Sequence, residues 1–173
     1  MKKISPEFSY IVDVRQIPGA GLTLDLRADE AQRRALAGRF GIPSVKSLSA
    51  RIVLSKINKD RVRVNGDFKA EVEQICVITL EPFDQQVRDH FSVVFSQESD
   101  SSLKLNEIDL NMDEDDDVEF LENGKIDVGE LTSEYLSLAL DPFPHAPDAV
   151  FHSESDAEMQ KNAFSVLEKL KFK

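Results

Sequence analysis

The feature that most constrains the fold is a period-two alternation of apolar and polar residues between Ser44 and Phe95. Side chains on a β-strand point to opposite faces in turn, so this pattern predicts strands with one buried and one solvated face. Antiparallel sheets commonly have that arrangement. We expect a bulge or bend at Gly66, inside the longest run. The apolar positions of that run are Val62, Val64, Gly66, Phe68, Ala70 and Val72.

Helix signals flank the alternating region on both sides. A capping box at residues 29–32 predicts a helix that ends near Arg39. A second capping box at residues 127–130 predicts a helix that ends before Pro142, because proline cannot join the hydrogen-bond ladder of a helix. A third helix is expected over residues 155–171, where apolar residues recur at helical spacing.

Further strands are expected over residues 7–14, 21–27 and 118–121, with a turn at 18–21 built from proline and glycine. An apolar fraction of 41% is enough to fill a core. The sequence therefore predicts a single α+β domain over residues 1–173. In this fold a mostly antiparallel, twisted sheet packs against two or three helices.

Charge is distributed unevenly along the 173 residues, whose formal net charge is -11. Residues 1–97 carry 15 Lys and Arg against 12 Asp and Glu, whereas residues 98–173 carry 6 against 20. Residues 97–117 alone hold nine acids and one lysine, so we expect a flexible acidic insertion with too little apolar area to pack. The acidic excess disfavours indiscriminate binding to nucleic acid or to an anionic membrane.

Candidate metal and catalytic motifs are incomplete. The segment 109–113 resembles the start of a calcium loop, but Glu114 and Phe120 stand where a glycine and a bidentate glutamate are required. His90 follows Asp89 on an expected strand, so these side chains should point to opposite faces rather than form a dyad. We therefore predict no catalytic, cofactor-binding or metal-binding residue and no small-molecule substrate.

The single cysteine, Cys76, lies in an apolar segment and cannot form an intramolecular disulfide. Two interpretations remain open: a small residue of the core, or a reactive thiolate. We favour the core residue, because a reactive thiolate needs a nearby cation and none is adjacent in sequence. At the N-terminus, Pro6, Glu7 and Asp13 interrupt any apolar stretch, so we expect a cytoplasmic protein without a membrane segment.

Positive charge is concentrated between Lys46 and Lys69, where seven Lys and Arg stand against two Asp. On paired strands several of these cations would share the solvated face and offer phosphates a modest binding surface. The alternative is an ordinary charged face that keeps the sheet in solution and blunts an edge. We favour this alternative, because no exposed aromatic residue alternates with the cations to stack nucleotides. The candidate rRNA-contact residues are Arg51, Lys56, Arg61, Arg63 and Lys69.

Several short motifs occur in a characteristic order. A central motif at residues 64–70 continues through Cys76 to residues 80–83, and the acidic insertion, residues 126–131 and residues 141–144 follow. This order resembles the YceD-like family, whose members are known as large ribosomal RNA subunit accumulation proteins. The resemblance extends from about Val45 to the C-terminus. Its motif residues in this chain are Gly66, Cys76, Leu80, Glu81 and Pro82.

The resemblance implies a non-enzymatic role in accumulation of large-subunit rRNA and assembly of the large ribosomal subunit. Two routes are open: the basic strand face contacts rRNA, or the acidic half binds a basic ribosomal or processing protein. We favour a protein contact, because the acidic half opposes the approach of a polyanion. The competing interpretations are an rRNA-processing hydrolase and an acidic protein-binding adaptor unrelated to the ribosome.

This chain departs from the family at its thiols. Relatives often carry a C-x-x-C-L pattern and further cysteines after the proline-rich segment. Here Thr79 stands where the second thiol would be, and the later region offers only His145 and His152. A thiol-based metal site is therefore not expected.

Overall fold

The computed structural model describes residues 6–96 and 117–150. Most of the acidic insertion, its calcium-like segment and the expected third helix lie outside the described residues. The elements in chain order are β1 (Ile11–Asp13), the 3₁₀ turn η1 (Val14–Gln16), β2 (Leu22–Arg27), α1 (Glu30–Phe40), β3 (Ser44–Lys56), β4 (Arg61–Ile75), β5 (Pro82–Ser96), β6 (Asp117–Phe120), the 3₁₀ turn η3 (Glu122–Gly124), β7 (Lys125–Asp127) and α2 (Val128–Ala139).

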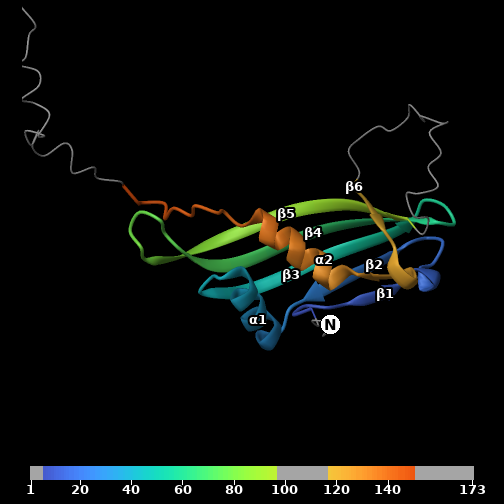
Figure 1. Ribbon diagram of the computed structural model, residues 1–173, viewed down its shortest axis with the longest axis horizontal. Coiled ribbons are helices and arrows are strands. Elements are labelled where there is room, and N and C mark those ends of the chain that lie inside the picture. Colours follow the sequence, from blue (N-terminus) through green and yellow to red (C-terminus); the bar gives the residue numbers. More distant parts are fainter. Residues whose placement is uncertain (1–5, 97–116, 151–173) are drawn as a thin grey trace, which may run out of the picture.

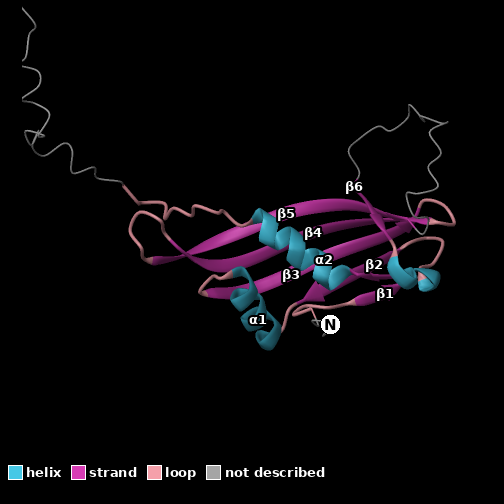
Figure 2. Cartoon of the chain, in the orientation of Figure 1, coloured by secondary structure: helices cyan, strands magenta, loops and turns pink. Residues whose placement is uncertain are grey.

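A five-stranded sheet in the order β2-β3-β4-β5-β6 forms the centre of the structure (Figures 1 and 2). Every neighbouring pair is antiparallel except β5 and β6, which are parallel. A second, two-stranded sheet pairs β1 with β7. The predicted α+β class and mostly antiparallel sheet are confirmed, and the described residues contain two α-helices. The N-terminal strand is shorter than predicted: it begins at Ile11 rather than at residue 7, and the chain turns into η1 after Asp13.

Strand register separates the residues of β2–β5 into two faces. The inner face packs against α1 and α2 (Figure 1), and its residues Ile52, Val64 and Val93 are fully buried. The outer face is turned away from both helices and alternates with the inner face along each strand. The predicted alternation is therefore confirmed over the three long strands, except at the end of β5, where Val94 and Ser96 of the outer face are buried as well. Other buried residues of the inner face are Leu48, Ala50, Leu54, Val62, Phe68, Ala70, Val72, Val87, Phe91 and Phe95.

Gly66 makes room for an aromatic ring. It lies opposite Phe91 in the register, and a Cβ atom at position 66 would stand 2.2 Å from the Phe91 ring. That ring stacks on Tyr135 of α2 with a centroid distance of 4.5 Å and an interplanar angle of 14°. The expected bulge does not occur at Gly66: the pairing is continuous there on both sides, and the register between β3 and β4 shifts instead between Val45 and Ser47. The glycine instead allows α2 to dock on the sheet through the Phe91 ring.

The helix ends follow the sequence signals in different ways. At α1, Asp29 and Gln32 form the reciprocal capping box, and Gly41 adopts the left-handed conformation at the C-terminus with φ 67°. At α2, Asp127 accepts hydrogen bonds from the N–H groups of Gly129 and Glu130. The reciprocal half of that predicted box is not made, because the Glu130 carboxylate pairs with an arginine of α1 instead.

We predict that Gly66→Ala lowers the free energy of unfolding by about 1–3 kcal/mol, the usual cost of overpacking a core. The added methyl group would displace the Phe91 ring from its position between Gly66 and Tyr135. Urea unfolding measures this change. The matched control is Gly38→Ala on α1, where nothing lies within 4 Å of the added carbon and stability should be unchanged or higher. Equal effects of the two substitutions would contradict this account.

Candidate functional site

The structure places most of the candidate rRNA-contact residues on the outer face. Arg51 of β3 and Arg61, Arg63 and Lys69 of β4 occupy the positions that alternate with buried inner-face residues. Lys56 has the opposite parity, since Leu54 and Ile52 of the same strand are buried. The outer face therefore brings together four of the five candidates, and the strand pattern separates Lys56 from them.

Arg51 is engaged by carboxylates on both sides. Its Nε lies 2.9 Å from Oδ1 of Asp25, and the hydrogen bond from Arg51 lowers the pKa of that carboxyl group. On the other side, Asp67 stands directly opposite Arg51 in the register. This cross-strand order of negative, positive and negative groups neutralises Arg51, so the residue is a weak candidate for binding a phosphate.

A row of cations crosses the outer face next to the row of Arg51, two residues farther along each strand. We use the term basic row for Arg27 of β2, Lys69 of β4 and Arg88 of β5, with Ser49 of β3 between the first two. The register pairs Arg27 with Ser49, Ser49 with Lys69, and Lys69 with Arg88. All three cations are exposed. Arg27 and Arg88 were not predicted, because their place beside Lys69 depends on the register of three strand pairs.

The remainder of the outer face has mixed charge. Towards the β4–β5 turn, Lys46 pairs with Asp84, and the Ser44 hydroxyl donates a hydrogen bond to Glu73 over 3.2 Å. At the opposite end of β4 lie Arg61 and the half-buried Arg63. The positive region that the sequence placed along residues 46–69 is thus divided in the fold. The basic row is the part in which three cations share one cross-strand row that holds no carboxylate.

The family-motif residues after Gly66 form the turn between β4 and β5. The N–H of Cys76 donates to the Glu81 carbonyl, and the N–H of Leu80 donates to the Cys76 carbonyl, both over 2.9 Å. Leu80 has a positive φ of 59°, which is uncommon for a residue other than glycine. A later segment is fastened to this turn, since the N–H of Val77 donates to the Pro144 carbonyl over 2.9 Å.

Cys76 is buried, as predicted, but its surroundings are polar N–H groups rather than a strand core. The residue lies just after β4, and its sulfur accepts a hydrogen bond from the Thr79 N–H at 3.5 Å. Hydrogen bonds from the Ala146 N–H first, and then from Thr79, lower the pKa of the Cys76 thiol to about 6, although burial opposes this change. The sequence shows no cation beside Cys76, and the N–H donors that lower its pKa come together only in the fold.

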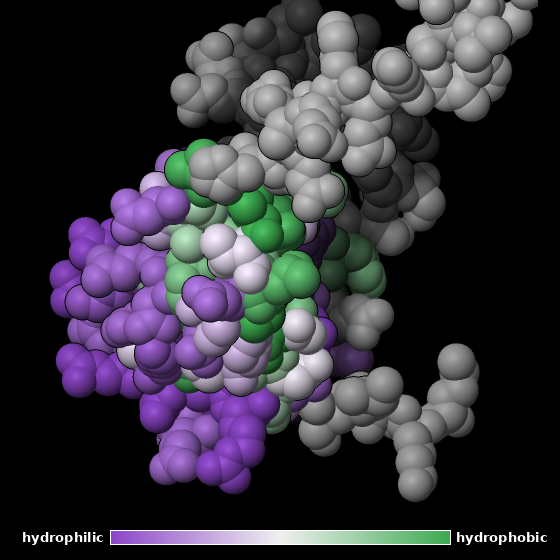
Figure 3. All heavy atoms as spheres, turned by 90° about the vertical axis from the view of Figure 1, so that its left-hand side faces the viewer, coloured by the Kyte–Doolittle hydropathy of each residue, from purple (hydrophilic) through white to green (hydrophobic). Residues whose placement is uncertain are grey.

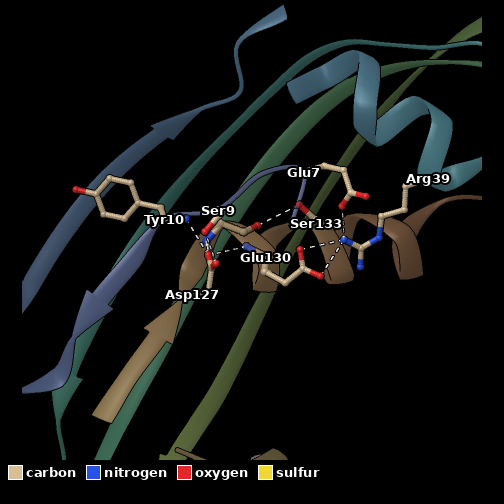
Figure 4. Close-up of polar contacts among 8 residues, drawn as sticks. Glu7, Ser9, Tyr10, Arg39, Asp127, Glu130 and Ser133 are labelled. Atoms are coloured by element: carbon tan, nitrogen blue, oxygen red, sulfur yellow. Dashed lines mark hydrogen bonds and ion pairs between the residues drawn. The ribbon is translucent and has the colours of Figure 1, made fainter. Parts of the chain in front are cut away.

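A second polar cluster fastens the N-terminal segment to α2 (Figure 4). The Asp127 carboxylate accepts hydrogen bonds from the Tyr10 N–H over 2.8 Å and from the Ser9 hydroxyl. Gly129 allows the segment to approach, because a Cβ there would lie 2.7 Å from the Tyr10 nitrogen. The motif at residues 126–131 therefore has a structural explanation in the docking of the N-terminal segment.

An arginine completes this cluster from α1. Arg39 Nη1 lies 3.0 Å from Oε2 of Glu7 and 2.8 Å from Oε1 of Glu130, so one cation joins the N-terminal segment to both helices (Figure 4). Farther along α2, burial and then repulsion from Glu130 and Glu119 raise the pKa of Glu134. The carboxylates of α2 thus lie on the helix that covers the inner face, away from the basic row.

Three further expectations concern a catalytic pair, a metal site and a membrane segment. Asp89 and His90 are closer than predicted, with 3.7 Å between Oδ1 and Nδ1, because the Asp89 carboxylate turns to accept the His90 N–H. Within residues 6–96 and 117–150, no group of three or more His, Cys, Asp or Glu side chains is placed to hold a metal ion. Neither described α-helix has the length and apolarity needed to cross a membrane.

Comparison with family models matches residues 64–171 to the family described as large ribosomal RNA subunit accumulation protein YceD. The match covers more than half of the chain and includes Gly66, the Cys76–Pro82 turn and the residues of α2. Neither the curated proteins nor the solved structures contain a significant match to this sequence.

We predict that Asp127→Ala releases the N-terminal segment as well as removing a helix cap. The substitution should cost about 0.5–2 kcal/mol of stability from the cap alone. It should also speed hydrogen exchange at the Tyr10 amide, which donates to Asp127. Asp29→Ala is the matched control, because Asp29 caps α1 without contacting the N-terminal segment. The account is wrong if the Tyr10 amide exchanges equally fast in both variants.

The thiol of Cys76 should titrate near pH 6 in the folded protein and near pH 8.5 in urea. Thiolate ultraviolet absorbance reports on this residue alone, because the chain has one cysteine. Since folding lowers this pKa, the free energy of unfolding should decrease as the pH falls from about 8.5 to about 6. Cys76→Ser should lack that part of the pH dependence. A folded-state midpoint equal to the one in urea would contradict the hydrogen-bonded geometry.

Proposed function

The chain belongs to the YceD family of large ribosomal RNA subunit accumulation proteins, and we propose that it supports accumulation of this RNA by binding its phosphate backbone through the basic row. In this proposal the protein acts by contact and carries out no reaction. The coarse role comes from the family. The contact is inferred from the outer face of the sheet, because a long run of paired strands offers a surface on which charges are held in line.

The observation that carries the proposal is the direct pairing of Lys69 with Arg88. Like charges opposite each other on neighbouring strands destabilise a sheet. Here they occur on the exposed face, and a third cation, Arg27, extends the row across Ser49. A polyanion lying across the strands would relieve this repulsion and release counterions from its phosphates. Arg27 and Arg88 are separated by three strand spacings, roughly 14 Å in all.

Geometry also reduces the electrostatic objection to an RNA contact. Residues 117–150 contain eight acids and one lysine, which would repel a polyanion that approached them. The acids of α2, Glu130 and Glu134, lie on the helix that covers the inner face, whereas the basic row lies on the outer face. The sheet itself separates the two. This arrangement supports an RNA contact over the protein contact that net charge alone favours.

We predict that Lys69→Glu weakens binding to purified large-subunit rRNA and reduces the slope of log affinity against log salt by about one, the change expected for one lost phosphate contact. Arg88→Glu should act in the same way. Filter binding at several salt concentrations measures both quantities. Lys59→Glu is the matched control, because it changes the net charge equally at an exposed position in the β3–β4 turn, outside the basic row.

The same variants distinguish the proposed contact from a general charge effect in cells. Lys69→Glu should reduce the protein's co-sedimentation with large-subunit precursors on a sucrose gradient and lower the ratio of large- to small-subunit rRNA. Lys59→Glu should leave both unchanged. An equal loss of affinity in the two variants, or an unchanged salt slope for Lys69→Glu, would show that the basic row does not contact RNA.

A further inference from the structure

Four large apolar side chains are exposed together at the end of the β4–β5 hairpin. We call this surface the apolar tip and define it as Ile75, Val77, Leu80 and Phe143. Their exposed fractions are 42%, 44%, 75% and 69%. The hydrogen bond from Val77 to Pro144 holds the segment of Phe143 against the turn. Viewed from this end, apolar surface gathers in the centre and hydrophilic surface lies beside it (Figure 3). Contiguous exposed apolar surface of this kind marks interaction sites.

The apolar tip is held in a fixed shape before any partner binds. Gln74 donates a side-chain hydrogen bond to the Asp141 carbonyl over 3.0 Å, and the Asp141 carboxylate accepts the Phe143 N–H over 2.9 Å. Two backbone hydrogen bonds close the turn on the other side of Leu80. A preformed surface avoids the entropy cost of ordering loops at an interface.

Leu80 combines two unfavourable features. Its φ of 59° lies in the left-handed region that glycine adopts without strain, and its side chain is three-quarters exposed. Glycine at this position would therefore make the folded state more favourable than leucine does. Strained residues of this kind concentrate at functional sites, where the strain positions a group for contact. The Leu80 side chain is thus best explained by what it presents to solvent.

The surroundings of the apolar tip are acidic. We use the term acidic rim for the six carboxylates of residues 70–87 and 140–150, segments that contain no Lys or Arg. The neighbouring cation, Lys46 of β3, is already paired with Asp84. Three members of this acidic rim, Glu81, Asp141 and Asp148, are exposed. An RNA would be repelled here, and a second copy of the chain would bring the same carboxylates against these. Residues 151–173 carry four acids and four lysines, so they offer no net complementary charge.

We propose that the apolar tip docks a basic protein, one that inserts an apolar side chain between Leu80 and Phe143 and places Lys or Arg against the acidic rim. This contact is distinct from the RNA contact and does not depend on it. Ile75 lies six residues along β4 from Lys69, which is roughly 20 Å in an extended strand. Both surfaces can therefore be occupied at once.

The test uses the full chain and the protein fraction of purified large ribosomal subunits, freed of RNA, as the probe. Leu80→Gly removes the apolar side chain and suits the positive φ, so thermal stability should be unchanged or higher. Binding of a basic protein from the fraction, identified by mass spectrometry and then measured in purified form, should fall by about tenfold or more. Phe120→Ser on β6 is the matched control, because Phe120 is also exposed, at 56%, and lies outside the tip.

Several results would overturn the proposal. Leu80→Gly and Phe120→Ser could bind the basic protein equally well. The wild-type chain could be a dimer that Leu80→Gly converts to a monomer, which would make a second copy the occupant. Carbodiimide cross-linking could join Glu81 to a lysine within residues 151–173 rather than to a lysine of the basic protein. Because the probe contains no RNA, failure here leaves the result for the basic row unaffected.

Discussion

The register between β4 and β5 is the constraint on which the rest of the structure depends. The two strands pair without interruption from Arg61 opposite Ser96 to Ile75 opposite Pro82. A slip of one residue would turn every side chain of a strand to the other face. Gly66 opposite Phe91 prevents such a slip, because the Phe91 ring occupies the space that any other side chain would need. The same ring stacks on Tyr135, so the register also places α2 on the sheet.

Both proposed contact surfaces follow from this register. It sets Lys69 beside Arg88 on the outer face, and β2 and β3 then align Arg27 in the same row. It also ends the hairpin at the Cys76–Glu81 turn, where the segment around Phe143 attaches through hydrogen bonds. A rigid sheet thus holds the basic row and the apolar tip at a fixed distance from each other. Such a body could hold an RNA and a protein next to each other during assembly.

Much of the fold was predictable because its signals are local. The alternation over β3–β5 and the Asp29–Gln32 capping box depend on neighbouring residues, and both are confirmed. Contacts between distant segments were not predictable in the same way. The role of Gly66 depends on Phe91, which lies opposite it on another strand. The Glu130 side chain does not complete the expected capping box, because it pairs with Arg39 of the other helix. The thiol of Cys76 is controlled by the N–H of Ala146, seventy residues later in the chain.

The candidate site shows the same division. Positive charge along residues 46–69 was visible in the sequence, but the register determines which cations stand together. Arg51 is neutralised by Asp25, whereas Lys69 gains Arg27 and Arg88 as neighbours.

The most direct test of an RNA contact at the basic row is an NMR titration of the full chain with a large-subunit rRNA fragment. The account predicts shift changes along Arg27, Ser49, Lys69 and Arg88, across four strands, with Lys59 unaffected. Changes confined to α2 or to the apolar tip would contradict it.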